Sequence, residues 1–433
     1  MRFPILWLAI LGGCASATTP PARTPLPPIA ASAEINDAVK ETVAAELASL
    51  MEAYRWFHQN AELSNKEFKT SERFAAEAKQ AGWTVVEKVG GTGVVAVFRN
   101  GAGPVVLSRI DMDGLPVKEL TGLPYASATD AMHACGHDSH LTIGVGILRA
   151  LPRLRNRWSG TAVVIGQPAE EVGLGAKQMI ADPRFAEALP GKPVACLSVH
   201  DFPTAAGMVG VCSGYASANV DSLDILVHGK GGHGAWPHET VDPIVIGSEI
   251  VLALQTIVSR KLNPGTRAVV TVGTFNAGTK RNVIGPEARL QLTVRSYDAE
   301  TRTTLLQEIR HIAARVSEAH RAPKAAEVIV AEDPTPAGYH DPTLSTRMKA
   351  VFQGLLGRDR VYDSPPMMGG EDFSRFPLHF GVPGLQIAVG GAKPGHDPTI
   401  GLHSPRWAVD PEPTVQAGTA AMVRGMIDLF PKE

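Results

Sequence analysis

The chain has 433 residues, of which 44% are hydrophobic and 19% are charged, and its formal net charge is −2. This is the composition of a soluble globular protein that is too long for one ordinary core, so we expect two domains. A net charge near zero without long runs of Lys or Arg argues against nucleic acid or an anionic membrane surface as the partner.

The N-terminus is predicted to be an export signal. Arg2 precedes an apolar run, residues 3–11, that is too short to span a bilayer. Two cleavage sites compete. Ala15-Ser16-Ala17 suits signal peptidase cleavage before Thr18, whereas residues 11–14 resemble a bacterial lipobox in which Cys14 carries a lipid anchor. A Pro-rich tether over residues 18–28 favours the lipobox. With either site, we expect an exported bacterial protein that is periplasmic or membrane-anchored.

The next segment is predicted to alternate helices and buried strands. Helical periodicity covers residues 38–58, 70–81 and 140–154, and strands are predicted over 84–89, 93–99, 104–110, 161–167 and 194–199. Three of these strands lead into polar residues, namely Asp111 and Asp113, Glu170 and Glu171, and His200. Because ligands gather at the carboxyl ends of strands in open α/β sheets, we expect one site there.

From about residue 215 the predicted order of strands and helices changes to β-α-β-β-α-β, the ferredoxin-like order. Its elements are predicted over residues 220–227, 242–261, 268–276, 288–296, 300–319 and 327–331, and elements over 344–356, 385–388 and 415–429 follow. The predicted fold is therefore α/β: a catalytic domain with a mostly parallel sheet and helices on both faces, plus an inserted ferredoxin-like α+β domain for lid closure or dimerisation. The predicted divisions are 1–33 (leader and Pro-rich tether), 34–214 and 332–433 (catalytic domain), and 215–331 (inserted domain).

Two short stretches carry the chemistry, His133-Ala134-Cys135-Gly136-His137-Asp138 and Gln167-Pro168-Ala169-Glu170-Glu171. A thiolate and an imidazole two residues apart can reach one metal region from a single turn. Of two adjacent carboxylates, one can ligate metal while the other moves protons. With His200 and His403 they make an S/N/O ligand set for zinc, manganese or cobalt. A lone Cys-Gly-His would suggest a structural Cys and a capping His, but the Glu pair favours a hydrolytic metal site.

Other histidines and cysteines are interpreted more simply. His133, His140 and His238 are expected to be structural. Export would permit a disulfide between Cys196 and Cys212, and two buried free thiols are the alternative that the sequence leaves open.

Taken together, the motifs resemble those of the aminoacylase/carboxypeptidase family of two-metal amidohydrolases, and most closely its branch of hippurate hydrolases and indole-acetyl-amino-acid hydrolases. The matching motifs lie at residues 111–116, 132–138, 168–171, 229–238, 282–284, 370–373 and 402–405. The resemblance implies two divalent metal ions held by Cys135, His137, Glu171, His200 and His403, with Glu170 as the general base.

The resemblance also implies that substrate is bound by residues His233, Asn282, Arg295 and Gly370, with His233 acting across the interface of a homodimer or higher oligomer. Asp111 stands where the broader family often has a ligand His, so Asp111 and Asp113 are expected only to orient the ligands.

The expected activity is hydrolysis of the amide bond of N-acyl amino acids or small peptides by metal-activated water. A metal-dependent dipeptidase or carboxypeptidase is the closest alternative. Two further classes remain open. A receptor built on an inactive metal fold disagrees with the intact Glu170, and a cysteine hydrolase would need Cys135 and His137 to act as a nucleophile–base pair from positions too close along the chain.

Overall fold

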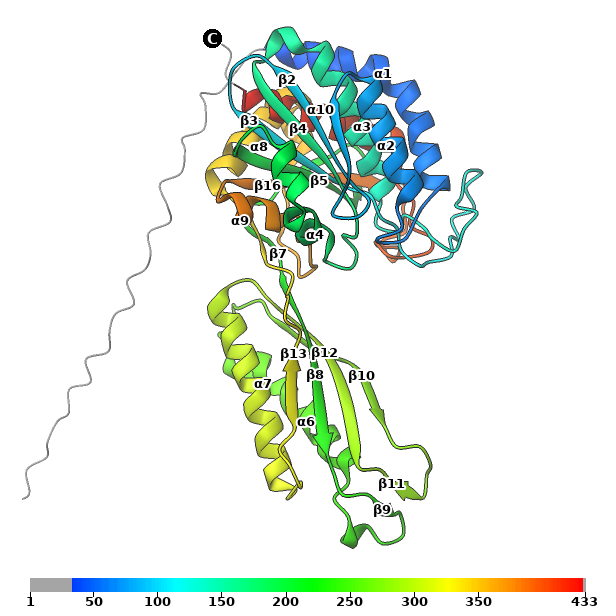
Figure 1. The fold of residues 1–433 in the computed structure, drawn as a ribbon, viewed down its shortest axis with the longest axis vertical. Helices are drawn as coiled ribbons and strands as arrows, with labels where there is room; N and C mark the ends of the chain where they lie inside the picture. The colour runs from blue at the N-terminus through cyan, green and yellow to red at the C-terminus, as the bar shows by residue number, and fades with distance from the viewer. Residues whose placement is uncertain (1–32, 431–433) are drawn as a thin grey trace, which may run out of the picture.

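The computed structural model describes residues 33–430. The predicted leader, with Cys14 and both cleavage sites, lies outside the described residues. The described chain forms two sheets, each with its own hydrophobic core, and Figure 1 shows the larger domain above the smaller one.

The larger domain is built on an eight-stranded sheet in the order β1-β2-β4-β3-β5-β16-β6-β15. The strands are β1 (Thr84–Val89), β2 (Gly93–Asn100), β3 (Val105–Asp111), β4 (Gly160–Gln167), β5 (Pro193–Ala205), β6 (Val209–Val211), β15 (Val361–Asp363) and β16 (Gly384–Ala392). The central strands β4, β3, β5 and β16 are parallel, whereas β1 and β2 are antiparallel at one edge. The predicted mostly parallel sheet is thus confirmed.

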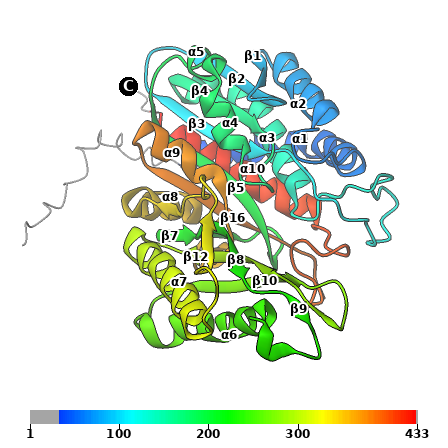
Figure 2. The same ribbon diagram turned by 60° about the horizontal axis from the view of Figure 1, so that its bottom comes forward.

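Helices cover both faces of this sheet (Figure 2). One face packs against α1 (Ala33–Gln59), α2 (Phe68–Gln80), α3 (His137–Arg153), α8 (Pro342–Leu356) and α10 (Pro411–Asp428). The other face packs against α4 (Gly175–Ala181), α5 (Pro183–Ala188) and α9 (Arg375–Phe380), through Met179, Phe185 and Phe376. Since both faces are covered, β4 is buried throughout and β3 is buried from its second residue on, although β3 also carries Ser108, Arg109 and Asp111.

The smaller domain is a four-stranded antiparallel sheet in the order β10-β12-β8-β13, with two helices on one face. Its elements are β8 (Asn219–His228), α6 (Pro243–Thr256), β10 (Val269–Ala277), β12 (Glu287–Ser296), α7 (Ala299–Ala319) and β13 (Glu327–Val330). Both the chain order and the sheet order are ferredoxin-like, as predicted.

Helix α6 continues into a π-helical turn (Ile257–Lys261), and the combined segment is, within the described residues, the one helix long and apolar enough to cross a membrane. In this fold it packs on the sheet instead, with Ile246, Ile250 and Leu254 buried. Only part of its apolar surface therefore serves the core of the smaller domain, since Ile244, Val245 and Leu252 are exposed.

The two domains are joined where β7 (Gly214–Ser217) pairs with β14 (Gly338–His340). These strands, like β6 and β15, have three or four residues and are too short to show a period in the sequence. The observed strand β5 is also longer than the strand predicted over residues 194–199. It continues to Ala205 because its last residues pair with β16. His200 therefore lies inside a strand, which corrects its predicted position after the strand end.

The cysteine question is answered by the fold. Cys196 lies in the core beneath α4, α5 and α9, and Cys212 lies between β6 and β7. Both are buried free thiols, so the structure has no disulfide between them.

Candidate metal centre

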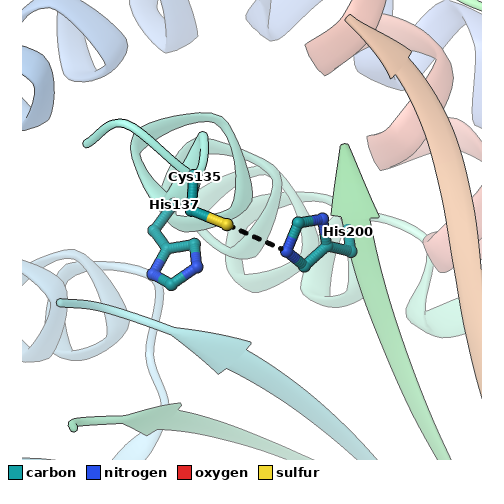
Figure 3. A group of neighbouring side chains, drawn as sticks. All are labelled: Cys135, His137 and His200. Carbon is teal, nitrogen blue, oxygen red and sulfur yellow. Dashed lines mark hydrogen bonds between the residues drawn. The ribbon is translucent and has the colours of Figure 1, made fainter. Parts of the chain in front are cut away.

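Cys135 and His137 are placed at the start of helix α3 by a sharp turn. Gly136 between them has φ of 77°, and a Cβ at this position would lie 1.8 Å from Asp201 Oδ1. Only glycine fits both the left-handed backbone and the close approach. The turn directs the Cys135 thiol toward His200 from β5, with Sγ 3.5 Å from Nε2, and His137 lies beside them (Figure 3).

The rings of His137 and His200 are oriented by backbone carbonyls. His137 Nδ1 donates to the carbonyl oxygen of Asp113 at 2.8 Å, and His200 Nδ1 donates to that of Asp201 at 2.7 Å. Each Nε2 is then left as an acceptor facing the centre, which is the arrangement found in metal-binding histidines. His137 Nε2 is buried without a hydrogen-bond partner.

Glu170 and Glu171 are held by carboxylates that accept hydrogen bonds from their backbone. The Asp113 carboxylate accepts hydrogen bonds from the backbone amides of Glu170 and Glu171, both at 3.1 Å. The Glu67 carboxylate accepts one from the backbone amide of Ala169 at 2.9 Å. Ala169 has φ of 52°, an uncommon conformation for a residue other than glycine. The loop therefore brings both Glu side chains to His137, with Glu170 Oε2 3.9 Å and Glu171 Oε1 3.8 Å from His137 Nε2.

His403 approaches from a different loop. Its amide donates to the Ala134 carbonyl at 2.8 Å, and its φ is 67°. Its Nε2 lies 3.5 Å from Glu171 Oε2. Strained backbone of this kind persists only where the surrounding structure holds it, and it clusters at functional sites.

The donor atoms converge as a metal centre requires. They form overlapping groups whose atoms all lie within 4.8 Å of one another: Cys135, His137 and His200; Cys135, Glu171 and His403; His137, Glu170 and Glu171. All five ligands predicted from the sequence are therefore brought together, with Glu170 beside them.

Unpartnered polar groups show that these residues fit cations. Among the described residues, neither His137 Nε2 nor the buried Glu171 Oε1 has a hydrogen-bond partner. Burial, and then the neighbouring Glu371, raise the pKa of Glu170 well above its usual value, and burial also raises the pKa of the Glu171 carboxyl. Burial raises the pKa of the Cys135 thiol as well, which is opposite to what a cysteine nucleophile needs. Divalent ions would satisfy these donors and stabilise the carboxylates and the thiolate.

Asp111 and Asp113 are fully buried behind the donor atoms. Asp111 accepts a hydrogen bond from His140 Nδ1 at 2.7 Å, while His140 Nε2 lies 2.8 Å from Asp201 Oδ1. Burial alone would lower the pKa of His140, but the two carboxylates raise it to about 9. His140, whose Nε2 also accepts the backbone amide of Asp201 at 2.7 Å, is thus a structural bridge between β3 and β5. Asp111 also belongs to a buried group with His137 and His140 that could hold a metal ion.

The buried guanidinium of Arg109 was not predicted from the sequence. It pairs with Asp111 and, at 2.9 and 3.1 Å, with Glu371 and Asp372. Arg109 lies in a predicted apolar strand, and Glu371 is 262 residues away, so no local pattern connects them. Glu67 was also not predicted, because the Ala169 amide from which it accepts a hydrogen bond lies far along the chain.

The centre opens into a cavity of about 430 Å³ between the two domains, which we call the metal cavity. The larger domain contributes Cys135, Glu170, Glu171, His200, Gly370 and His403, and the smaller domain contributes Val220, Ser222, Arg295 and Ala331. Two of the four predicted substrate-binding residues, Arg295 and Gly370, thus line it. Arg295 also donates to the Met368 carbonyl at 2.7 Å.

The other two predicted substrate-binding residues, His233 and Asn282, lie elsewhere. His233 is in β9 (Gly232–His233), which pairs with β11 (Val283–Ile284), and the Gly234 amide donates to the Asn282 carbonyl at 2.9 Å. Both residues are exposed and do not line the metal cavity. Figure 1 shows β9 and β11 at the end of the smaller domain farthest from the larger one.

Residues 107–427 match the peptidase family M20/M25/M40. The chain belongs to this family. It is 35% identical over 366 residues to an N-acetyl-L-cysteine deacetylase of Bacillus subtilis, covering 84% of each chain. It is 34% identical over 380 residues to thermostable carboxypeptidase 2 of Saccharolobus solfataricus, covering 86% of this chain and 93% of that one.

Solved structures agree with this assignment. A Bacillus subtilis protein described as a dinuclear metal-binding peptidase from the M20 family superposes with a TM-score of 0.75 and 28% identity, over 89% of this chain and 98% of that one. The protein is accordingly a metal-dependent hydrolase of amide or peptide bonds.

Proposed function

We propose that the protein hydrolyses N-acyl amino acids, releasing a carboxylic acid and a free amino acid. The observation that carries this proposal is the convergence of five metal donors around Glu170, among which His137 Nε2 and Glu171 Oε1 are buried without a partner. A metal-dependent hydrolytic centre needs donors for the metal and a carboxylate that is free to move a proton, and the residues of the cavity could supply both.

Two divalent ions would be held by Cys135, His137, Glu171, His200 and His403. When bound, such ions polarise a carbonyl oxygen and make water a stronger nucleophile at neutral pH. The thiolate favours zinc, and the mixed oxygen and nitrogen ligands also suit manganese or cobalt.

Glu170 is proposed to take the proton from the attacking water and return it to the leaving amine. The hydrogen bond of its amide to Asp113 fixes the backbone, while its side chain faces the cavity. Burial, and then Glu371, raise the pKa of the Glu170 carboxyl, and bound divalent ions would favour its carboxylate form, which accepts the proton.

Arg295 is proposed to bind the carboxylate of the amino-acid part. It is the cationic side chain that the smaller domain contributes to the metal cavity. A guanidinium can donate two parallel hydrogen bonds to a carboxylate, and Nη1 already donates to Met368. Closure of the smaller domain over the larger one would bring this group to the substrate and exclude water.

A carboxypeptidase or dipeptidase activity is the second candidate, and the carboxypeptidase relative favours it. Both activities break an amide bond to an amino acid with a free carboxylate, so Arg295 would serve either. They differ in whether the acyl part carries an amino group.

We further propose that the protein is an exported homodimer or higher oligomer, with His233 and Asn282 completing the cavity of a partner chain. The exposure of both residues, away from the cavity of their own chain, supports this arrangement. Export is proposed from the N-terminal sequence alone, and Cys14→Ala should release the protein from membranes if Cys14 carries a lipid.

The test is a panel of N-acyl amino acids and dipeptides with purified, metal-loaded protein. We expect hydrolysis of N-acyl amino acids that a chelator abolishes and added zinc, manganese or cobalt restores. Faster hydrolysis of dipeptides would favour the second candidate, and full activity of the chelated protein would contradict both.

A further inference from the structure

A second cavity of about 250 Å³ lies in the larger domain beside the metal cavity, and we call it the side cavity. Its lining comes from the end of β5, the strands β7 and β14, the segment before Gly369, and β16. The side chains that matter most are Phe202, Thr204, Ala216, Met367 and Ala388.

Three contacts join the side cavity to the metal cavity. Met367 lines both. Phe202 of the side cavity packs on the ring of His200, with ring centroids 4.9 Å apart. Gln386 of the side cavity donates to Glu371 of the metal cavity at 2.6 Å. The two spaces therefore share a wall, and one of its members is a flexible, unbranched methionine.

The polar groups in the side cavity are already occupied by other protein groups. His340 Nδ1 donates to the Cys212 carbonyl at 3.2 Å, and its Nε2 accepts a hydrogen bond from the backbone amide of Gln386 at 3.2 Å. Ser217 Oγ accepts the amide of Gly338 at 3.1 Å. Burial lowers the pKa of His340 to about 4, so its ring is neutral near pH 7. No lysine, arginine, aspartate or glutamate lines this cavity. An uncharged apolar group would thus enter with little loss of hydrogen bonding.

The segment before Gly369, which forms part of the shared wall, is hydrogen-bonded to the smaller domain. Three successive carbonyls, those of Pro366, Met367 and Met368, accept hydrogen bonds from Arg267 at 3.1 Å, Tyr297 at 3.0 Å and Arg295 at 2.7 Å. All three donors belong to the smaller domain or its edge. A movement of that domain would therefore carry Met367 with it and shift the wall between the two cavities.

We propose that the side cavity is a specificity pocket that takes an uncharged apolar group of the substrate, an aromatic ring or a branched or medium-length aliphatic chain, with Met367 at its entrance. This proposal rests on the proposed function, because it needs an amide substrate in the metal cavity. A dry apolar cavity of about 150 Å³ is enough to bind benzene, so the volume here suits a single ring or a somewhat larger group. The apolar group can belong to the acyl part or to the side chain of the amino acid.

Two substrate series distinguish these sources. In one, the acyl group of N-acyl-alanine grows from acetyl through butyryl and hexanoyl to benzoyl; in the other, the amino acid of N-acetyl substrates changes from Ala to Leu to Phe. In the series whose variable group enters the side cavity, kcat/KM should rise roughly fourfold for each methylene buried. A flat response in both series would overturn the proposal.

Thr204→Trp blocks the cavity, and Ala205→Trp is the matched control. Thr204 is exposed at the rim, where its hydroxyl lies 3.3 Å from that of Tyr362, so the substitution should not disturb the core. Ala205 is the next residue, exposed and outside the cavity lining. Thr204→Trp should reduce the preference for the largest good substrate over its smallest homologue by about tenfold or more. Ala205→Trp should leave that preference unchanged. An equal effect of both variants would contradict the assignment.

Binding of indole provides a readout that does not depend on turnover. Titration of the metal-loaded protein with indole, monitored by calorimetry, should show one binding site. Thr204→Trp should weaken binding at this site, and Ala205→Trp should not. If no N-acyl amino acid is hydrolysed but indole binds in this pattern, the proposed function fails and the apolar site stands. If hydrolysis proceeds but indole binding is absent or equal in the two variants, the side cavity is not the pocket.

Discussion

The metal cavity and the tip formed by β9 and β11 are built in opposite ways, although the sequence predicts functional residues in both. In the metal cavity, His137, Glu170 and Glu171 are fixed through the backbone and side chain of Asp113. At the tip, His233 is exposed, and its Nδ1 accepts a hydrogen bond only from the nearby amide of Ala235 at 3.1 Å.

This difference indicates what each region can do alone. The metal donors all come from one chain, and all but His403, whose side chain is 57% exposed, are buried or half-buried, so the chemistry needs no second copy to position them. The tip is placed away from that chemistry and keeps its side chains accessible. Substitutions in the cavity should therefore cost stability, metal or turnover in any assembly, whereas substitutions at the tip should affect activity only where the tip meets a cavity.

The largest effect is expected at Glu170. Glu170→Gln is nearly isosteric but cannot accept the proton, so kcat should fall on the order of 10² to 10⁴. Metal content should be retained, because Glu171 and not Glu170 is assigned as the ligand. Steady-state kinetics and elemental analysis of the same samples check both statements. Turnover within a few-fold of wild type would show that another group is the base.

Arg109→Met should cost the most in stability. It leaves Asp111, Glu371 and Asp372 buried without their cation, and breaking such a buried cluster costs about 3–5 kcal/mol. The control is Arg315→Met, since Arg315 pairs with Glu318 and the two side chains are 66% and 70% exposed. The control should lose about 1 kcal/mol or less. Equal losses in urea unfolding would mean that the Arg109 cluster is not a special support.

A smaller and pH-dependent effect is expected at His58 behind helix α3. Burial opposes its charge, but Asp138 at 2.6 Å and Glu119 at 3.0 Å raise its pKa to about 10. Because the folded pKa lies above the ordinary value of about 6.5, the stabilisation is complete below that pH and is lost as the pH rises toward 10.

His58→Gln should therefore lower stability by about 1.5–3 kcal/mol near pH 6 and by less near pH 10. Unfolding curves of both proteins across this range provide the measurement. A difference that stays constant with pH would show that His58 acts by packing alone.

The smallest structural effect is expected at the tip. His233→Ala should leave the free energy of unfolding unchanged within about 0.5 kcal/mol, because the side chain is exposed. Its activity should nevertheless fall if the tip completes a partner's cavity. Mixing inactive His233→Ala chains with inactive Glu170→Gln chains should then restore part of the activity, since mixed dimers contain one site with both native residues. No recovery after verified subunit exchange would place the action of His233 within its own chain.

The sequence was informative where chemistry or periodicity is local. The buried strands β3 and β4 were predicted from their apolar runs, and the five metal donors from short motifs and a family resemblance. The ferredoxin-like order was also readable, since its strands and helices are long enough to show their periods.

What the sequence could not show depends on contacts between distant segments. Arg109 stands in an apolar run and is paired with acids far along the chain, so its role as a buried support leaves no local pattern. The position of His200 was misjudged because the extra length of β5 depends on its pairing with β16. The side cavity is formed where five separate segments meet, and none of them is unusual by itself.

Metal content measured together with turnover tests the central claim most directly. The account predicts close to two divalent ions per chain in the purified wild type, fewer in Cys135→Ser with a matching loss of activity, and an unchanged number in the inactive Glu170→Gln. A wild-type protein that is free of metal and fully active would contradict it.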